Sequence, residues 1–337
     1  MKKVSVVILN WNGAALLREF LPSVIANTNS ELADVYVADN GSTDDSIAVL
    51  ESEFPEVGII PMDKNRGFAE GYNQALKAIQ TEYSVLLNSD VQVTPGWIEP
   101  LVSFMDSHSQ VAACQPKIRA YRSPEYFEHA GACGGFIDHL GYPFCRGRLF
   151  QTLEKDNQQH DSIIPIFWAT GACLFIRTKL YYEVGGLDGD FFAHMEEIDL
   201  CWRLKSRGYD LYCIPQSTVF HLGAATLSTE SPRKTYLNFR NNLLMLYKNL
   251  PQKELNKVLF IRLILDILAF FVTLVGGKTG NAVAIWKAVT SFYKDKKQFT
   301  AKRNENLKLA VRTSFPEMYS GSIVCDFYIK KKETVIL

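Results

Sequence analysis

The first hundred residues alternate short runs of β-branched and other apolar residues with segments of helical periodicity. The strand-like runs cover residues 4–9, 35–38, 58–60 and 83–87. The helical patterns cover residues 14–25, 45–54 and 68–79. This alternation is typical of βαβ units, in which helices cover a parallel sheet. It predicts that the chain begins with an α/β domain.

Polar side chains follow three of the predicted strands at the point where each strand ends. Asn10 and Asn12 follow the first strand, Asp39 and Asn40 follow the second, and Asn88 and Asp90 follow the run at 83–87. In open parallel sheets, ligands bind beyond the carboxyl ends of the strands. One such residue alone would be an ordinary turn residue. Their recurrence at three strand ends favours a binding site there.

The composition restricts the compartment and the partners. Of the 337 residues, 47 % are hydrophobic, which is enough for one large domain or two moderate ones. Lys plus Arg and Asp plus Glu each number 36, so no net charge favours nucleic acid as a partner. The seven cysteines form no C-x-x-C pair, which favours reduced thiols in a cytoplasm. The apolar run after Lys3 ends at Asn10, so we interpret it as a strand rather than a signal peptide.

The rest of the chain has less regular patterns. Residues 116–164 show no sustained period and predict long loops over the site. A strand is predicted at residues 170–176 and a helix at 195–205, ended by Gly208. From residue 236 the pattern is mostly helical, with a short β-like stretch at 323–329.

Two segments in the first domain suggest contacts with a nucleotide. In residues 37–45, Ser42 or Thr43 is expected to cap the next helix, whereas Asp39 has no such folding role and suits a base imide or a ribose hydroxyl. Arg66 and Gly67 lie at a predicted helix N-terminus, which suits a phosphate. Neither segment has the G-x-G-x-x-G spacing of nicotinamide-dependent dehydrogenases.

Acidic residues at two places suggest chemistry. Asp90, in Asn88-Ser89-Asp90, suits Mg²⁺ or Mn²⁺ shared with a diphosphate, although a capping role before Pro95 stays open. In the helix at 195–205, Asp199 can pair with Arg203 at i,i+4, whereas Glu197 points elsewhere. A free carboxylate is the better base. The flanking aromatic residues at 191, 192 and 202 favour this interpretation over a solvated charged face.

These motifs together resemble family 2 glycosyltransferases, above all the rhamnosyltransferase-like branch of bacterial polysaccharide assembly. The resemblance spans about residues 4–250 and is carried, in order, by residues 4–12, 39–44, 65–69, 88–90 and 185–203. It implies an α/β GT-A fold, with a mainly parallel central sheet flanked by helices, over residues 1–250. Residues 251–337 would form a helical extension. The implied activity is inverting transfer of a sugar, such as the rhamnose that this branch of the family suggests, from a dTDP- or UDP-sugar to a polysaccharide or lipid-linked glycan hydroxyl.

The resemblance also implies roles for single residues. The nucleotide-sugar site would be formed by Asn10, Asn12, Asp39, Asn65, Arg66, Gly67, Asn88, Ser89 and Arg240. Asp90 and His221 would hold Mg²⁺ or Mn²⁺. Glu197 would be the general base, with Glu196 and Asp199 beside it. The sequence departs from the family pattern twice, because Asn88 replaces the first acid of the D-x-D motif and Glu197 replaces an Asp.

The C-terminal extension leaves two interpretations open. Residues 258–275 are strongly apolar but contain Arg262 and Asp266, so the uncharged run is shorter than the ~20 residues of a spanning helix. Trp286 and the lysines at 294–297 suit a helix at the inner face of an anionic membrane. Packing on the catalytic domain or on a second copy of the chain fits the same pattern.

Two other functions, a nucleotide-binding scaffold and a nucleotidyltransferase, predict different sequence features. A degenerate domain that binds nucleotides as a scaffold would explain Asn88. A nucleotidyltransferase would need a glycine-rich basic loop after the first strand, where this chain has Asn10-Trp11-Asn12-Gly13.

Overall fold

A computed structural model describes residues 2–223 and 231–334 and contains a central sheet. Its strand order is β3–β2–β1–β4–β12–β6–β13–β11, and β5 also pairs with β13. The strands are β1 (Val4–Asn10), β2 (Ala33–Asp39), β3 (Gly58–Pro61), β4 (Tyr83–Asn88), β5 (Val91–Val93), β6 (Val111–Ala120), β11 (Ile164–Pro165), β12 (Cys173–Arg177) and β13 (Asp210–His221). The first four strands of this order are parallel, and β12 is antiparallel to both of its neighbours. The expected GT-A architecture therefore holds, with an antiparallel strand next to the parallel half.

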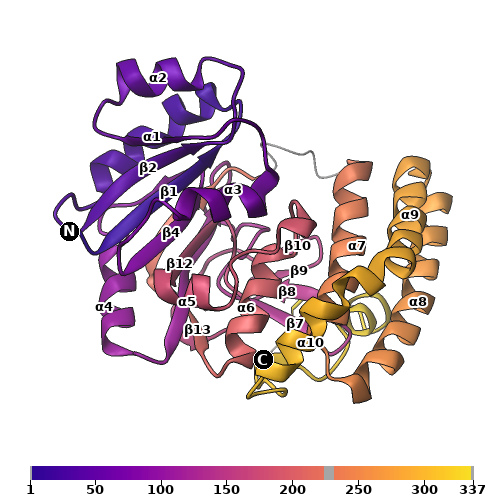
Figure 1. Cartoon of the computed structure of the whole chain (residues 1–337). Coiled ribbons are helices and arrows are strands. Elements are labelled where there is room, and N and C mark those ends of the chain that lie inside the picture. Colours follow the sequence, from indigo (N-terminus) through magenta and orange to yellow (C-terminus); the bar gives the residue numbers. More distant parts are fainter. Residues whose placement is uncertain (1, 224–230, 335–337) are drawn as a thin grey trace.

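Helices cover both faces of this sheet (Figure 1). They are α1 (Ala14–Asn27), α2 (Ser46–Glu53), α3 (Gly67–Leu76), α4 (Glu99–Ser107), α5 (Thr178–Glu183) and α6 (Glu196–Ser206). Strand β1 shows why both faces are needed. Val6 and Ile8 pack in one apolar cluster with α1 and α4, whereas Val7 belongs to the cluster that includes α3 and α6. A strand buried on both faces has a continuous apolar sequence, as residues 4–9 do.

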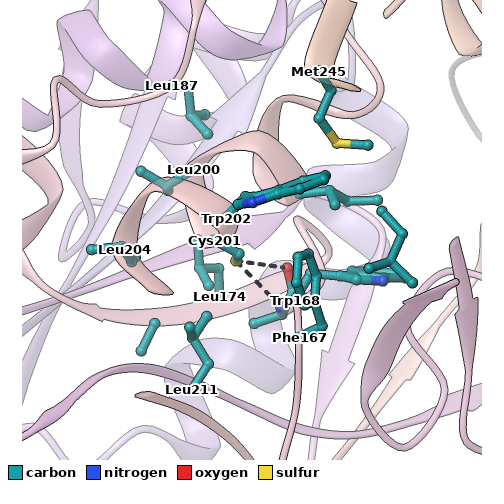
Figure 2. Packing of buried hydrophobic residues seen from close by; sticks show 14 of the residues in the cluster. Phe167, Trp168, Leu174, Leu187, Leu200, Cys201, Trp202, Leu204, Leu211 and Met245 are labelled. Carbon is teal, nitrogen blue, oxygen red and sulfur yellow. Dashed lines mark hydrogen bonds between the residues drawn. The ribbon is translucent and has the colours of Figure 1, made fainter. Parts of the chain in front are cut away.

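Helix α6 is held against the sheet by its apolar side (Figure 2). Trp202 lies over the cluster, and its ring meets that of Phe167 edge-on at 5.3 Å. The Cys201 thiol accepts a hydrogen bond from the backbone N–H of Ala169 at 3.4 Å. These contacts fix the direction of α6, and therefore the position of the acidic residues at its first turn.

Residues 116–164 are not only loops, as the sequence had suggested. They contain the end of β6 and four short strands, β7 (Gly135–Asp138), β8 (Pro143–Cys145), β9 (Arg148–Leu149) and β10 (Thr152–Leu153). With β14 (Met318–Tyr319) they form a second sheet, in the order β10–β9–β8–β7–β14. Strands of two to four residues are too short to show a period, which is why the pattern missed them.

The C-terminal part is helical, as expected from residue 236 onward. It consists of α7 (Pro232–Asn249), α8 (Gln252–Val275), α9 (Thr279–Asp295) and α10 (Thr300–Leu309). The β-like stretch expected at 323–329 is wrong, because Cys325–Ile329 forms a turn of π-helix. Strand β14 lies just before it and pairs with β7, so the end of the chain joins the second sheet.

Candidate active site

The carboxyl ends of β1 and β2 meet through the side chains of Asn10 and Asp39. The two residues are register partners, and the Asn10 amide donates to Asp39 Oδ1 at 3.1 Å. The backbone N–H of Ser42 donates to the other oxygen, Asp39 Oδ2, at 2.9 Å. Asp39 therefore has the folding role that the sequence did not reveal, and it is 3 % exposed.

The turn after β2 is closed by Asn12 from the turn after β1. Asn12 has a positive φ of 51°, and its side-chain oxygen accepts from the backbone N–H of Thr43 at 2.7 Å. The expectation that Ser42 or Thr43 caps α2 is wrong, because α2 begins only at Ser46. Asp44 serves the first turn instead, since its Oδ1 accepts from the backbone N–H of Ser46 at 3.1 Å.

The segment before α3 is anchored to the same strand end by Asn40. The Asn40 side chain accepts from the backbone N–H of Arg66 at 2.9 Å and donates to the carbonyl of Gly67 at 3.1 Å. Asn65 Oδ1 accepts from the backbone N–H of Gly67 at 2.8 Å. Asn65 and Gly67 are thus placed beside Asp39, whereas the Arg66 guanidinium pairs with Asp63 at 2.6 Å. The sequence placed Asn40 among the polar residues at this strand end, and the structure adds its role in holding the segment before α3.

A second group of polar residues lies where β4 and β13 end. His221 Nε2 is 3.1 Å from Asp90 Oδ1 and 3.4 Å from the Asn88 amide nitrogen. His221 Nδ1 lies 3.2 Å from Glu128 Oε2, and Ser89 stands half-buried between Asn88 and Asp90. Burial lowers the pKa of His221, but its hydrogen bonds to the carboxylates of Asp90 and Glu128 outweigh this effect and raise the pKa to about 10. Glu128 was not foreseen, because it is 93 residues from His221 and lies in the segment without a period.

This group has the donor atoms that a divalent cation needs. Asp90 Oδ1 and His221 Nε2 lie side by side at hydrogen-bonding distance, and Glu128 approaches the opposite ring nitrogen. A metal-bound histidine usually donates its second N–H to such a carboxylate. Among the described residues, no group of three or more His, Cys, Asp or Glu side chains could enclose a metal. The site therefore fits a cation that takes further ligands from a diphosphate and water.

The first turn of α6 carries two carboxylates that each have one buried oxygen without a hydrogen-bonding partner. These are the Oε2 atoms of Glu196 and Glu197, which accept no hydrogen bond from the described residues. Burial raises the pKa of Glu197 to about 7, and burial together with the charge of Glu197 raises the pKa of Glu196 well above its usual range. Glu197 is partly exposed, whereas Glu196 is 3 % exposed. A carboxylate with a pKa near neutrality suits proton transfer.

Glu197 lies near the edge of the sheet that carries Asn88. A Cβ added at Gly171 would be 3.9 Å from the Glu197 Cβ, and the next residue, Ala172, accepts a hydrogen bond from the backbone N–H of Asn88 at 3.0 Å. The α6 carboxylates and the end of β4 are therefore separated by one backbone segment.

Asp199, expected beside the base, does not face the site. It is fully buried, and its oxygens accept from Arg203 at 2.9 Å, Lys248 at 2.8 Å and Asn249 at 2.8 Å. The i,i+4 pair with Arg203 is confirmed. A carboxylate with three donors and no solvent cannot reach a substrate, so we correct its expected catalytic role to a structural one.

Helix α7 supplies basic residues to the same region. Arg240 donates to the carbonyl oxygen of Asp190 at 3.0 Å and is half-buried. The Arg233 guanidinium lies 5.0 Å from the ring centre of Phe192, and burial together with Lys234 lowers the pKa of His194 to about 4. Arg233 and Lys234 were missed, since nothing in the sequence relates them to residues 40 positions earlier.

A parallel α/β half with polar residues at its strand ends, joined to a carboxylate pair on a following helix, defines the transferases of the GT-A fold. The chain belongs to glycosyl transferase family 2, whose family model matches residues 5–185. It is a glycosyltransferase, and the resemblance found in its sequence is confirmed.

Relatives and solved structures agree with this family. The chain is 27 % identical over 236 residues to N-acetylglucosaminyl-diphospho-decaprenol L-rhamnosyltransferase of Mycobacterium tuberculosis, covering 64 % of this chain and 75 % of the relative. A mannosyltransferase of Pyrobaculum calidifontis, solved with GDP-Man and Mn²⁺, superposes with a TM-score of 0.53 at 14 % identity over 92 % of this chain and 86 % of that one. GalNAc-T7, solved with UDP, GalNAc and Mn²⁺, gives 0.57 at 16 % identity over 74 % and 48 %.

Proposed function

We propose that this glycosyltransferase moves a hexose, such as rhamnose, from a nucleoside-diphosphate sugar to a hydroxyl of a lipid-linked glycan, with inversion. The observation that carries the proposal is the Glu197 carboxylate, which has a buried Oε2 without a hydrogen-bonding partner among the described residues and a pKa of about 7, close to the strand end that bears Asn88 and Asp90. The relative that acts on a decaprenol-linked acceptor supports the lipid-linked substrate.

In this proposal, Glu197 takes the proton from the acceptor hydroxyl as that oxygen attacks the anomeric carbon. The C–O bond to the diphosphate breaks, and the nucleoside diphosphate leaves with the electron pair. Arg240 stabilises the charge that grows on the diphosphate. Burial and the neighbouring Glu197 carboxylate raise the pKa of Glu196 well above its usual range, so Glu197 is the carboxylate that we assign as the base.

Asp90 and His221 would hold a divalent cation beside the diphosphate, and Glu128 would orient the His221 ring. Such a cation supplies Lewis-acid stabilisation of the leaving diphosphate. The imidazole ligand favours Mn²⁺ over Mg²⁺, because Mg²⁺ prefers oxygen ligands. Two solved GT-A structures contain Mn²⁺, which supports this choice.

Asn10, Asn12, Asp39, Asn65 and Gly67 would bind the nucleotide and its sugar. Hydrogen bonds that tie the three strand-end turns together support this role, since they give the nucleotide a preformed surface. The donor would carry dTDP or UDP. The protein would work in the cytoplasm, at the inner face of the membrane that contains the acceptor.

Calorimetric titration with UDP, dTDP and GDP, each with and without Mn²⁺, tests the proposal. We expect Mn²⁺-dependent binding of UDP or dTDP. Mn²⁺-independent nucleotide binding together with no turnover would instead support the degenerate scaffold, and the absence of any nucleotide binding would contradict both functions.

A further inference from the structure

Helix α8 exposes an apolar stripe along most of its length. Phe260, Ile264, Leu268, Phe271 and Val275 recur at helical spacing and are all more than half exposed. Helix α9 continues the stripe, because Trp286 is 56 % exposed and its ring lies 5.9 Å from that of Phe270 on α8. We call these six exposed side chains, the five on α8 and Trp286 on α9, the α8–α9 surface. Exposed apolar areas of this extent mark interaction sites.

The polar side of α8 faces the protein instead of the solvent. Arg262 and Asp266 are each 1 % exposed and lie 3.4 Å apart. Arg262 also donates to the carbonyl of Leu140 at 3.0 Å, and its guanidinium lies 4.1 Å from the ring centre of Tyr142. The middle of α8 is thereby attached to the second sheet.

This attachment decides between spanning a membrane and lying on one. Among the described residues, α8 is the one helix long and apolar enough to span, with a mean hydropathy of 2.6. Spanning would separate Arg262 from Leu140 and Tyr142 and would move an ion pair into hydrocarbon, which costs several kcal/mol. Lying in the interface keeps those contacts and still buries the α8–α9 surface.

The charge of the extension favours an anionic partner. Residues 251–337 contain 15 Lys and Arg against 7 Asp and Glu, a net charge of +8, whereas residues 1–250 contain 21 against 29, a net charge of −8. Exposed lysines flank the apolar stripe at Lys257, Lys287, Lys294 and Lys297. In a twofold dimer built on this surface, the same basic extension would face itself, which is repulsive.

We propose that the α8–α9 surface binds the headgroup boundary of an anionic lipid bilayer, with the stripe buried and the lysines at the headgroups. The inference deepens the proposed function, on which it rests for the lipid-linked acceptor, by naming the surface that meets the membrane. Each lysine near such a surface contributes about 1 kcal/mol, or about five-fold in binding.

Co-flotation of the full chain with vesicles tests this proposal. We expect binding to vesicles of 70 % phosphatidylcholine and 30 % phosphatidylglycerol, weak binding to pure phosphatidylcholine, and release by alkaline carbonate. Phe271→Ser with Trp286→Ser should lower the partition coefficient about ten-fold or more. The matched control is Val311→Ser, a 74 % exposed residue outside the surface, which should bind as the wild type does.

Three results would overturn the proposal: no flotation with anionic vesicles, retention after carbonate treatment, or a dimer that the double variant converts to monomer. Nucleotide titration of the same proteins without vesicles separates the two proposals. The double variant should bind nucleotide as the wild type does. If the wild type itself binds no nucleotide, the proposed function is refuted, while the vesicle result still stands.

A second, independent observation concerns the loop at residues 191–195, which leads into Glu196 and Glu197. Three of its non-glycine residues have positive φ, namely Phe192 at 63°, His194 at 69° and Met195 at 73°. Such conformations cost about 1–3 kcal/mol each and persist only where neighbouring groups impose them.

The side chain of Asn241, on α7, holds this loop. Its amide nitrogen lies 2.9 Å from each of the carbonyl oxygens of Phe191, Ala193 and His194, so two N–H groups are shared by three acceptors. Its oxygen accepts from Arg240 at 2.9 Å, and the residue is fully buried. We infer that Asn241 is a positioning residue, which sets the direction in which α6 presents Glu197.

The test compares Asn241→Ser with Asn238→Ala. Within the described part of the chain, the Asn238 amide donates to the carbonyl of Lys234 in the same helix and to no other group. We expect Asn241→Ser to lower kcat about 100-fold, as a misplacement of about 1 Å can, with donor KM and nucleotide Kd unchanged. If Asn241→Ser does not fold, Asn241→Asp removes the same donors at constant size and should behave alike. Two outcomes would refute the inference. One is a fall in kcat that the fraction of unfolded protein, measured by circular dichroism, fully accounts for; the other is a change in KM alone.

Discussion

At the scale of single residues, the proposed chemistry depends on the carboxylate of Glu197. Burial raises its pKa to about 7, and its Oε2 accepts no hydrogen bond from the described residues. We expect Glu197→Gln to lower kcat about 10²- to 10⁴-fold, the usual contribution of a general base. Nucleotide affinity should stay the same, and Glu99→Gln, an exposed glutamate on α4, serves as the control. Full turnover of Glu197→Gln would exclude Glu197 as the base.

The pKa of Glu197 also predicts how activity depends on pH. Only the ionised carboxylate accepts a proton, so kcat/KM should rise as the pH increases through about 7. Stopped assays between pH 5.5 and about 8.5, at saturating Mn²⁺, give this profile. A rate that is flat across pH 7 would contradict the assignment, provided that the protein stays folded over the range.

Stability should depend on pH in the opposite direction. The pKa of Glu197 is higher in the folded chain than the value of about 4.3 in an unfolded one, so the folded state binds the proton more tightly. The stabilisation by this proton is complete below about pH 4.3 and is lost as the pH rises through about 7. The melting temperature of the wild type should therefore fall between pH 5 and 8 more steeply than that of Glu197→Gln, as scanning calorimetry would measure.

At the scale of elements, helices α6 and α7 are joined by buried charges. Asp199 on α6 bonds to Lys248 on α7, and the same lysine reaches Asp188 Oδ2 at 2.5 Å. Asp199→Ala would leave Arg203 and Lys248 charged and buried, so the free energy of unfolding should fall by about 3–5 kcal/mol. Asp210→Ala removes an exposed pair with Arg312 and should cost at most about 1 kcal/mol. Denaturation in guanidinium chloride measures both variants, and equal losses would contradict the structural role of Asp199.

The elements also show what the sequence could and could not predict. Strands β1 to β4 and helices α1 to α3 lie within a few residues of the expected ranges, because their apolar periods are long and sustained. The second sheet was missed because its strands are too short to show a period. Glu128 and Asn241 could not be found, since each acts on residues about 50 or more positions away.

At the scale of the whole molecule, bonds cross the expected domain boundary at residue 250. Lys302 donates to Asp188 at 2.6 Å, Arg262 donates to the carbonyl of Leu140, and β14 extends the sheet of β7. We expect the full chain to unfold in one calorimetric transition. A chain ending at residue 250 should lose cooperative unfolding, because its second sheet would lack β14 and α7 would lack its contacts with α9 and α10. Two separate transitions of the full chain would instead indicate independent domains.

The two parts of the chain carry opposite net charges, which affects how the molecule is oriented as it approaches a membrane. A body with a net charge of −8 on residues 1–250 and +8 on residues 251–337 is an electric dipole with no net charge. In the field of an anionic bilayer it experiences a torque before it touches the surface. In the proposed membrane contact, that torque would turn α8 and α9 toward the lipid and the acidic residues 1–250 away from it. The field falls off over about 8 Å at physiological ionic strength, so the alignment would act only close to the lipid surface.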